Sequence, residues 1–197
     1  SGLRPKLKIA AYDKDRDDIN GKTHPGTRTF GIFSVIDIYN PSRISDEIYS
    51  TTVHELGHAA HWWQNNNAYN NCEDKVAESW ARVVKWTFTN REYKYIPAYN
   101  FSNGWQYLNT GNVSYIDHMK NGYTPVAIDL IDQFNQRENN GGNLNFPPDR
   151  VSGYNIQEIW NALNGAKNLD DWKNNLKHLN KPNPEYLDEL FDYYKNI

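Results

Sequence analysis

The stretch His54-Glu55-Leu56-Gly57-His58 decides the fold, because it sets two histidines four residues apart with a glutamate beside the first. The surrounding sequence favours a helix over about 46–64, since Ser45 can cap its start and Asp46 and Glu47 suit its positive end. Residues four apart in a helix differ by about 40° in direction and about 6 Å along the axis, so both imidazoles can reach one ion. The pattern H-E-x-x-H on a helix therefore predicts a zinc site with a glutamate as general base.

A catalytic zinc needs three protein ligands and one open position, so a third ligand has to come from outside this motif. The chain contains a single cysteine, Cys72, and so forms neither an internal disulfide nor a thiolate cage around zinc. Histidine and carboxylate side chains remain as the available ligands.

A glutamate on the next predicted helix, Glu78, follows His58 by 20 residues. This arrangement resembles the thermolysin-like gluzincin metallopeptidases, in which H-E-x-x-H on one helix is completed by a glutamate on the next. The resemblance covers about 54–82 and implies Glu78 as the third metal ligand beside His54 and His58. Its place between two alanines agrees with this role, because a neighbouring helix could approach closely there.

Two positions depart from the thermolysin-like pattern. Those enzymes carry an asparagine before the ligand glutamate and an aspartate four residues after it, whereas this chain has Ala77 and Arg82. The carboxylate that orients a ligand histidine is therefore unassigned, with Asp74 as a candidate. If Glu78 were instead a solvated helix residue, Glu73 or Asp74 would be the alternative carboxylate ligand.

His61 shares a helix face with His54 and His58 and has to be weighed as a rival ligand. It lies about 10 Å along the helix axis from His54, which is too far for all three imidazoles to bind one ion. The metzincin pattern places a glycine three residues after the second histidine and a third histidine six after it. Those positions hold His61 and Gln64 here. We therefore expect His61 to have a packing or supporting role.

The resemblance implies a zinc-dependent endopeptidase. In such an enzyme the zinc lowers the pKa of a bound water from about 15.7 toward about 7, and Glu55 takes its proton and passes it to the leaving amine. A further donor to the tetrahedral oxyanion is expected, usually tyrosine or histidine in gluzincins. His118 and Tyr123, in the predicted loop region after the second helix, are our candidates, with Tyr115 and Tyr154 as alternatives.

Two other functions use the same motif. One is a zinc hydrolase acting on a non-peptide amide, a cell-wall component or a glycoprotein, and the other is a zincin fold kept as a binding module. The chain has 14 Tyr, 7 Trp and 7 Phe, which suit core packing or, alternatively, a glycan-binding surface. The presence of Glu55 argues against a binding module, because binding a metal needs the histidines at most.

The remaining sequence predicts a small sheet ahead of the zinc helix and helices after it. Residues 7–12 and 29–39 are rich in β-branched and aromatic residues, which indicates two strands. Apolar residues recur at helical spacing in 72–89, 125–138, 155–164, 168–179 and 184–195. We therefore expect an α+β, zincin-like fold in one catalytic domain, 1–197, with the sheet and zinc helices over about 3–90 and a loop region and helical lobe over about 91–197. In gluzincins the edge of this sheet pairs with an extended peptide substrate.

Charge and apolar content limit the classes of partner that the sequence predicts. The net charge of −3 gives no electrostatic reason to expect nucleic acid, and no apolar run is long enough for a membrane span. The stretch 13–21 begins like a calcium loop but lacks its glycine and terminal glutamate, so we expect a solvated turn, with a calcium site as the alternative. Ser1-Gly2 is typical of the scar left by a cleaved tag, so we expect any signal peptide or upstream domain to have been removed. We expect a monomer that is secreted, periplasmic or at the cell surface.

Overall fold

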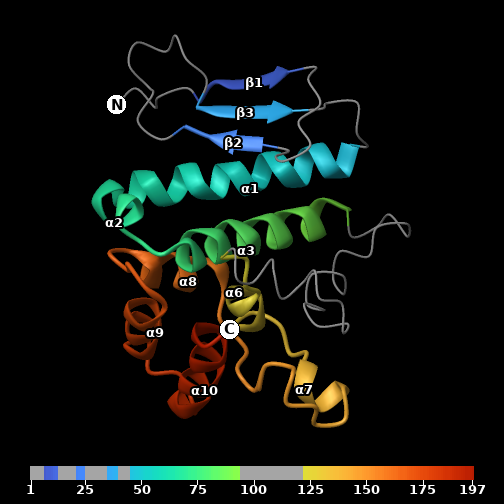
Figure 1. Ribbon diagram of the computed structural model, residues 1–197, viewed down its shortest axis with the longest axis vertical. Helices are drawn as coiled ribbons and strands as arrows, with labels where there is room; N and C mark the ends of the chain where they lie inside the picture. The colour runs from blue at the N-terminus through green and yellow to red at the C-terminus, as the bar shows by residue number, and fades with distance from the viewer. Residues whose placement is uncertain (1–6, 13–20, 25–34, 40–44, 94–121) are drawn as a thin grey trace.

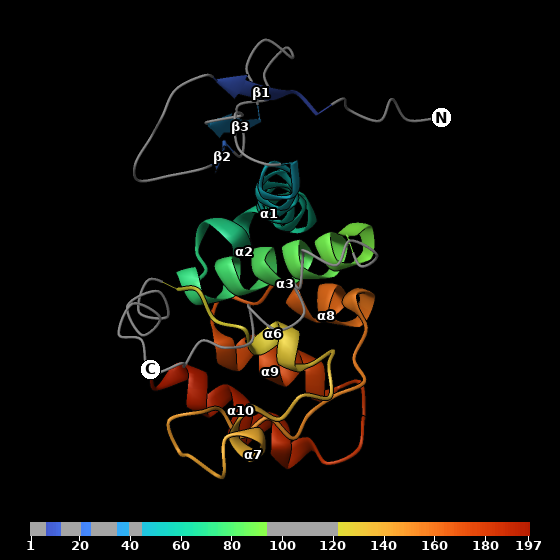
Figure 2. The same ribbon diagram turned by 90° about the vertical axis from the view of Figure 1, so that its right-hand side faces the viewer.

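The computed structural model describes residues 7–12, 21–24, 35–39, 45–93 and 122–197. A small three-stranded sheet lies at one end of the molecule, two long helices lie beneath it, and a group of shorter helices forms the other end (Figure 1). Turned by 90°, the molecule shows the sheet, α1, α3 and the C-terminal helices as successive layers (Figure 2). The predicted α+β class is confirmed.

The sheet has the order β1-β3-β2, with β3 (Ile36–Tyr39) at its centre. Strand β1 (Ile9–Tyr12) runs parallel to β3, and β2 (Gly21–Thr23) runs antiparallel to it. The described parts of the predicted strands 7–12 and 29–39 contain β1 and β3. Strand β2 was not predicted, because three residues without apolar alternation give no strand signal. The stretch 13–21, for which a calcium site is the alternative, lies outside the described residues except at its last residue, which begins β2.

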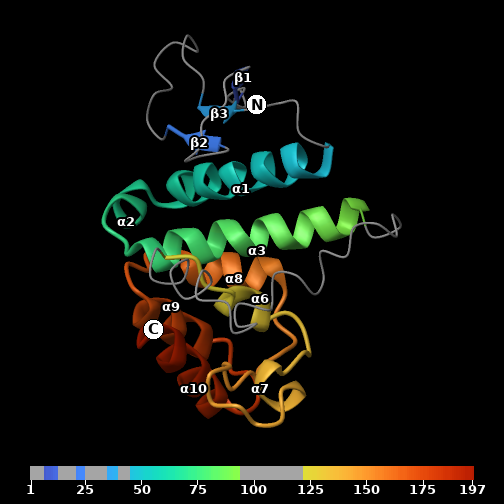
Figure 3. The ribbon, with the colours of Figure 1, turned by 45° about the vertical axis from the view of Figure 1, so that its right-hand side comes forward.

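The two long helices are α1 (Ser45–Gln64) and α3 (Asp74–Tyr93), which pack side by side (Figure 3). Both were predicted, although α3 ends four residues beyond the predicted end at 89. A short helix that was not predicted, α2 (Asn66–Asn70), connects them. Its start is fixed by Asn65, whose side chain accepts a hydrogen bond from the Ala68 amide.

The predicted helix over 125–138 is wrong, because the chain forms two short helices there, α6 (Val126–Asp129) and α7 (Gln136–Asn139). Between them the Asp132 side chain accepts a hydrogen bond from the Phe134 amide at 2.8 Å. This local bond satisfies an amide that a continuous helix would have used, and so interrupts the helix.

The last three predicted helices are confirmed. Their bounds are Ile156–Leu163 for α8, Leu169–Lys177 for α9 and Pro184–Lys195 for α10. Asparagine caps open two of them: the side chain of Asn155 accepts from the Glu158 amide, and that of Asn168 accepts from the Asp171 amide.

Two apolar clusters hold these layers together. The smaller one joins the sheet to α1 through Val35, Ile36, Ile38 and Ala59. The larger one joins α3 to the C-terminal helices and contains the largest fully buried side chains among the described residues, Trp172, Tyr194 and Phe191. Within the described ranges, no helix combines the length and apolar character that crossing a membrane requires.

Candidate metal centre

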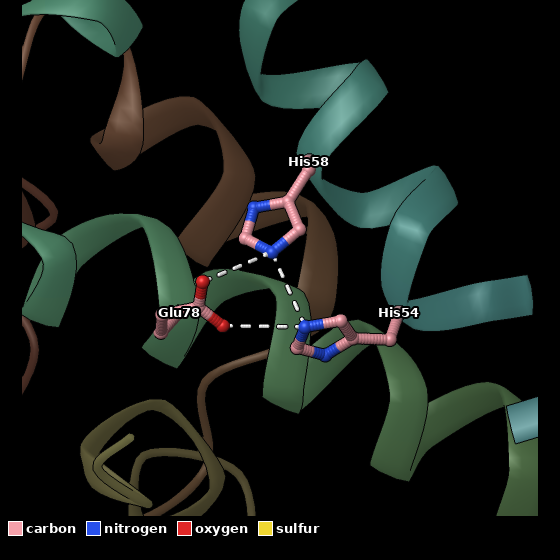
Figure 4. A group of neighbouring side chains, drawn as sticks. All are labelled: His54, His58 and Glu78. Carbon is pink, nitrogen blue, oxygen red and sulfur yellow. Dashed lines mark hydrogen bonds and ion pairs between the residues drawn. The ribbon is translucent and has the colours of Figure 1, made fainter. Parts of the chain in front are cut away.

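The histidines of the motif lie one turn apart in the middle of α1, on the side that faces α3 (Figure 4). The Nε2 atoms of His54 and His58 are 3.2 Å apart, and the two rings meet nearly at right angles. The sequence therefore places them as expected, because residues four apart on a helix present their side chains to the same neighbour.

Glu78 reaches the same point from α3. Its Oε2 lies 3.2 Å from His54 Nε2, and its Oε1 lies 3.3 Å from His58 Nε2. The three side chains thus converge with their donor atoms turned toward one another, which is an arrangement that could hold a metal ion (Figure 4). Glu73 and Asp74, the alternative carboxylates, are exposed and do not belong to this group.

A close contact between the backbones of α1 and α3 makes this convergence possible. A Cβ atom added at Gly57 would lie 2.9 Å from the Cα of Ala81, closer than real Cβ contacts allow. The indole Nε1 of Trp80 also donates a hydrogen bond to the Gly57 carbonyl at 2.9 Å. Glycine inside a helix costs about 1 kcal/mol relative to alanine. In return, Gly57 lets α1 and α3 pack closely at the turn that carries His54 and His58.

The electrostatics of the group favour a cation between its members. Burial lowers the pKa of His54, and hydrogen bonds from His54 and His58 outweigh burial to hold the pKa of Glu78 well below its usual range. Two imidazole nitrogens and a carboxylate at these separations bring lone pairs together, which is favourable only if a proton or a metal ion lies among them. The three residues therefore fit a bound metal ion.

Glu55 lies next to this group, buried on α1. The hydroxyl of Thr23, on β2, donates to Glu55 Oε2 at 2.6 Å and also lies 2.8 Å from the Glu55 carbonyl oxygen. A cavity of about 450 Å³ opens over the group, and its lining includes His54, Glu55 and Glu78. A carboxylate with one oxygen hydrogen-bonded and the other free can act on a water or a substrate in this cavity.

Of the candidate oxyanion donors, the structure brings only Tyr123 to the described part of the site. Its ring stacks on that of His54 at a centroid distance of 6.1 Å, and it lines the cavity. Burial, followed by the charges of Glu78 and Glu55, raises its pKa, so the hydroxyl stays protonated and can donate.

The other candidate donors do not take part in the described site. His118 and Tyr115 lie outside the described residues. Tyr154 packs in the C-terminal apolar cluster, with Lys181 Nζ 4.7 Å from its ring centre.

His61 is fully buried and stands outside the group that could hold a metal. Its ring meets that of Tyr69 at 5.1 Å and 89°, and burial, helped by His58, lowers its pKa to about 4. Neither of its ring nitrogens has a hydrogen-bond partner among the residues that the structure describes. This is the packing position that the helical spacing predicted.

The orientation of the ligand histidines differs from the expectation. In the described part of the chain, the buried Nδ1 of His58 has no hydrogen-bond partner, so Asp74 does not orient it. Asp74 instead lines the cavity.

Three residues of the site were missed from the sequence. Thr23 and Gly21 lie on the unpredicted β2, and Tyr69 lies on the unpredicted α2, where it lines the cavity and approaches the His58 ring at 6.3 Å. No spacing rule links them to the motif. No other sequence signal indicated them, because β2 and α2 are too short to show a periodicity.

Comparison with known proteins adds nothing to this geometry: no protein-family model, no curated protein and no solved structure matches the chain.

Proposed function

We propose that the protein is a zinc-dependent endopeptidase of the gluzincin type, with a zincin-like fold. The convergence of His54, His58 and Glu78 carries this proposal. In a tetrahedral site with bonds of about 2.0–2.1 Å, neighbouring ligand atoms are about 3.3 Å apart. The three separations here are 3.2, 3.2 and 3.3 Å, which suits such an ion. Two imidazoles and one carboxylate also form the ligand set of catalytic zinc in peptidases.

When bound, a zinc ion would supply Lewis acidity, which polarises a carbonyl and lowers the pKa of water. Glu55 stands beside the ligands and faces the cavity, where it can accept a proton from water and return it to the leaving amine. Tyr123 stacks on His54 and lines the same cavity with a protonated hydroxyl, which can donate to the oxyanion of the tetrahedral species. The chain's own groups thus supply a base and a donor around one point.

The position of β2 supports a peptide as the substrate. It is an edge strand of the sheet, and all three of its residues line the cavity. An extended peptide can pair with a free strand edge through its backbone, which needs no charged pocket. With this substrate class we propose, as from the sequence, a monomer that is secreted, periplasmic or at the cell surface. A non-peptide amide in cell-wall material or a glycoprotein is the competing substrate.

Glu55→Gln tests the proposal. This variant should bind one zinc per chain, because the ligands are untouched, yet lose about 100-fold or more of kcat on casein or a quenched peptide. The matched control is Glu73→Gln, the same change at an exposed glutamate outside the ligand group, which should keep full activity.

Three outcomes would revise the proposal. Hydrolysis undiminished in Glu55→Gln would remove Glu55 from the mechanism. Activity of the unsubstituted protein on peptidoglycan but not on casein would shift the substrate to cell-wall amides. One bound zinc without hydrolysis of any of these substrates would favour a binding module.

A further inference from the structure

We propose that strand β2 is a clamp that positions the general base, with Thr23 as its positioning residue and Gly21 as the residue that lets the strand approach. The inference rests on the proposed role of Glu55 and goes beyond it, because it assigns a function to two residues outside the motif. Thr23 does not act on the substrate; it acts through Glu55.

The first observation is the hydrogen bonding of Thr23. Its single hydroxyl hydrogen has two acceptors in reach on Glu55, the carboxylate Oε2 at 2.6 Å and the carbonyl oxygen at 2.8 Å. The shorter distance is to the carboxylate, as is usual for a bond to a charged acceptor. One threonine thus contacts both the side chain and the backbone of the base, which fixes the direction in which the carboxylate points.

The second observation is the space around Gly21. A Cβ atom there would lie 2.8 Å from Thr51 Cγ2, 3.0 Å from Glu55 Cγ and 3.1 Å from Glu55 Oε1. The strand therefore lies directly against the helix turn that carries the base. A larger residue would displace either the strand or the Glu55 side chain.

The two residues work on the same face. Alternate residues of a strand point the same way, so Gly21 and Thr23 both face α1 while Lys22 between them is exposed. Glu55 Oε2 is held by the threonine, and Oε1 lies beside the glycine, next to the cavity that Glu55 lines. The contact thus leaves one carboxylate oxygen available for proton transfer.

The clamp is anchored through the sheet to the helix that it holds. In the register of β2 with β3, Gly21 lies opposite Ile38 and Thr23 lies opposite Ile36. Both isoleucines are buried in the cluster that contains Ala59 of α1. Strand, sheet and helix therefore form one packed unit around the base.

A base held in one direction needs no reorganisation when it accepts the proton, whereas a free glutamate side chain has three rotatable bonds to fix. Loss of the threonine bond should therefore reduce kcat by about 10-fold or more, with KM and zinc affinity unchanged. A change in KM alone would instead assign Thr23 to substrate binding.

The experiment compares Thr23→Val, Thr23→Ser and the control Thr52→Val in the full chain. Thr52 is a threonine of α1 whose hydroxyl donates to the Ile48 carbonyl, outside the cavity. We expect Thr23→Val to show the loss of kcat, Thr23→Ser to recover most of it, and Thr52→Val to keep wild-type kinetics. Wild-type kcat in Thr23→Val, or a serine variant no better than the valine variant, would overturn the proposal.

A second readout keeps this test separate from the test of the peptidase function. Crystal structures of the zinc-loaded wild type and Thr23→Val should show the Glu55 carboxylate in one rotamer in the first and in several, or in a displaced one, in the second. If the wild type proves inactive on peptides, the proposed function fails while the order of Glu55 still decides the clamp. An unchanged single rotamer in Thr23→Val would refute the clamp.

Discussion

The two faces of α3 belong to different kinds of interface. Toward α1, the helix presents Glu78 to His54 and His58, in a region with several buried polar atoms. Toward the C-terminal helices, it contributes fully buried valines, Val76 and Val83, to a large apolar cluster. One helix thus carries a ligand on one side and a share of the core on the other.

The difference shows where stability and chemistry come from. Among the described residues, His58 and His61 have buried ring nitrogens without a hydrogen-bond partner. Each such atom costs about 1–3 kcal/mol, which the first interface cannot recover from its own packing. The apolar cluster behind α3 supplies the stability that lets the first interface keep polar groups in an arrangement that could hold a metal ion.

The largest effect should come from the ligand side. Glu78→Ala should weaken zinc binding by several orders of magnitude and abolish hydrolysis, because the site loses both a ligand bond and a negative charge. The fold should survive, since the apolar cluster is intact. Equilibrium dialysis with a competing chelator measures the affinity, and circular dichroism checks the fold.

The control for this variant is Glu73→Ala. Glu73 is an exposed glutamate just before α3 and is not part of the ligand group. It should bind zinc normally. Retained zinc in Glu78→Ala together with lost zinc in Glu73→Ala or Asp74→Ala would contradict the ligand assignment.

The opposite result is expected from the core side. Trp172 is fully buried and meets the Phe191 ring edge-on at 6.3 Å. Trp172→Ala should lower the free energy of unfolding by about 3–5 kcal/mol, through lost burial and the cavity left behind. Urea titration measures this loss, and the molecules that remain folded should still bind one zinc. A larger loss of stability from zinc removal than from Trp172→Ala would show that the metal holds the fold together.

An acidic pair makes the C-terminal part sensitive to pH. Burial, with the charge of Asp132, raises the pKa of Asp129 to about 8, and burial, with the charge of Asp129, raises that of Asp149. The folded chain keeps protons that an unfolded aspartate releases above about pH 4. The free energy of unfolding should therefore fall as the pH rises from about 4 toward 8.

Asp129→Asn isolates this effect, because the amide imitates the neutral acid beside Gln136 and Tyr194, its two hydrogen-bond partners. Its free energy of unfolding should decline less between pH 5 and pH 8 than that of the wild type. Both proteins are compared by urea titration in chelator, so that metal binding does not contribute. Parallel pH profiles would mean that Asp129 does not hold the proton.

The smallest effect on the metal should come from His61, which lies beside the ligands without joining them. His61→Leu keeps the packing volume and removes two unpartnered nitrogens, so it should still bind one zinc per chain with near-native affinity. Isothermal titration calorimetry measures the number of zinc ions bound per chain and the affinity. Loss of stoichiometric zinc would make His61 a ligand and favour a three-histidine site.

The features that could be predicted from the sequence are those set by interactions between residues close together in the chain. Helix spacing alone placed His54 and His58 together, and apolar periodicity located α8 to α10, because these signals act within a few residues. Glu78 needed a family resemblance, since nothing local tells which helix will pack against α1.

The predictions that failed concern contacts between residues far apart in the sequence and elements of only a few residues. Thr23 contacts Glu55 across 32 residues, and three-residue β2 has no periodicity from which to predict it. The helix expected over 125–138 breaks at the Asp132 side chain, where one local hydrogen bond outweighs the apolar spacing. His118, the other candidate donor, lies outside the described residues.

The contact at Gly57 has a consequence for which ion the site selects. How closely ligand atoms from two helices can approach depends on the distance between the helices, and the close approach of Gly57 to the Ala81 backbone sets that distance beside the histidines. Zinc bonds are about 2.0–2.1 Å long, whereas calcium bonds are about 2.3–2.6 Å. A methyl group inserted at Gly57 would push Glu78 away from the imidazoles and widen the space among the three side chains. Because Gly57 has no side chain, α1 and α3 pack closely enough to favour small ions over large ones. Selectivity by ionic radius is then set by helix packing as well as by the ligands.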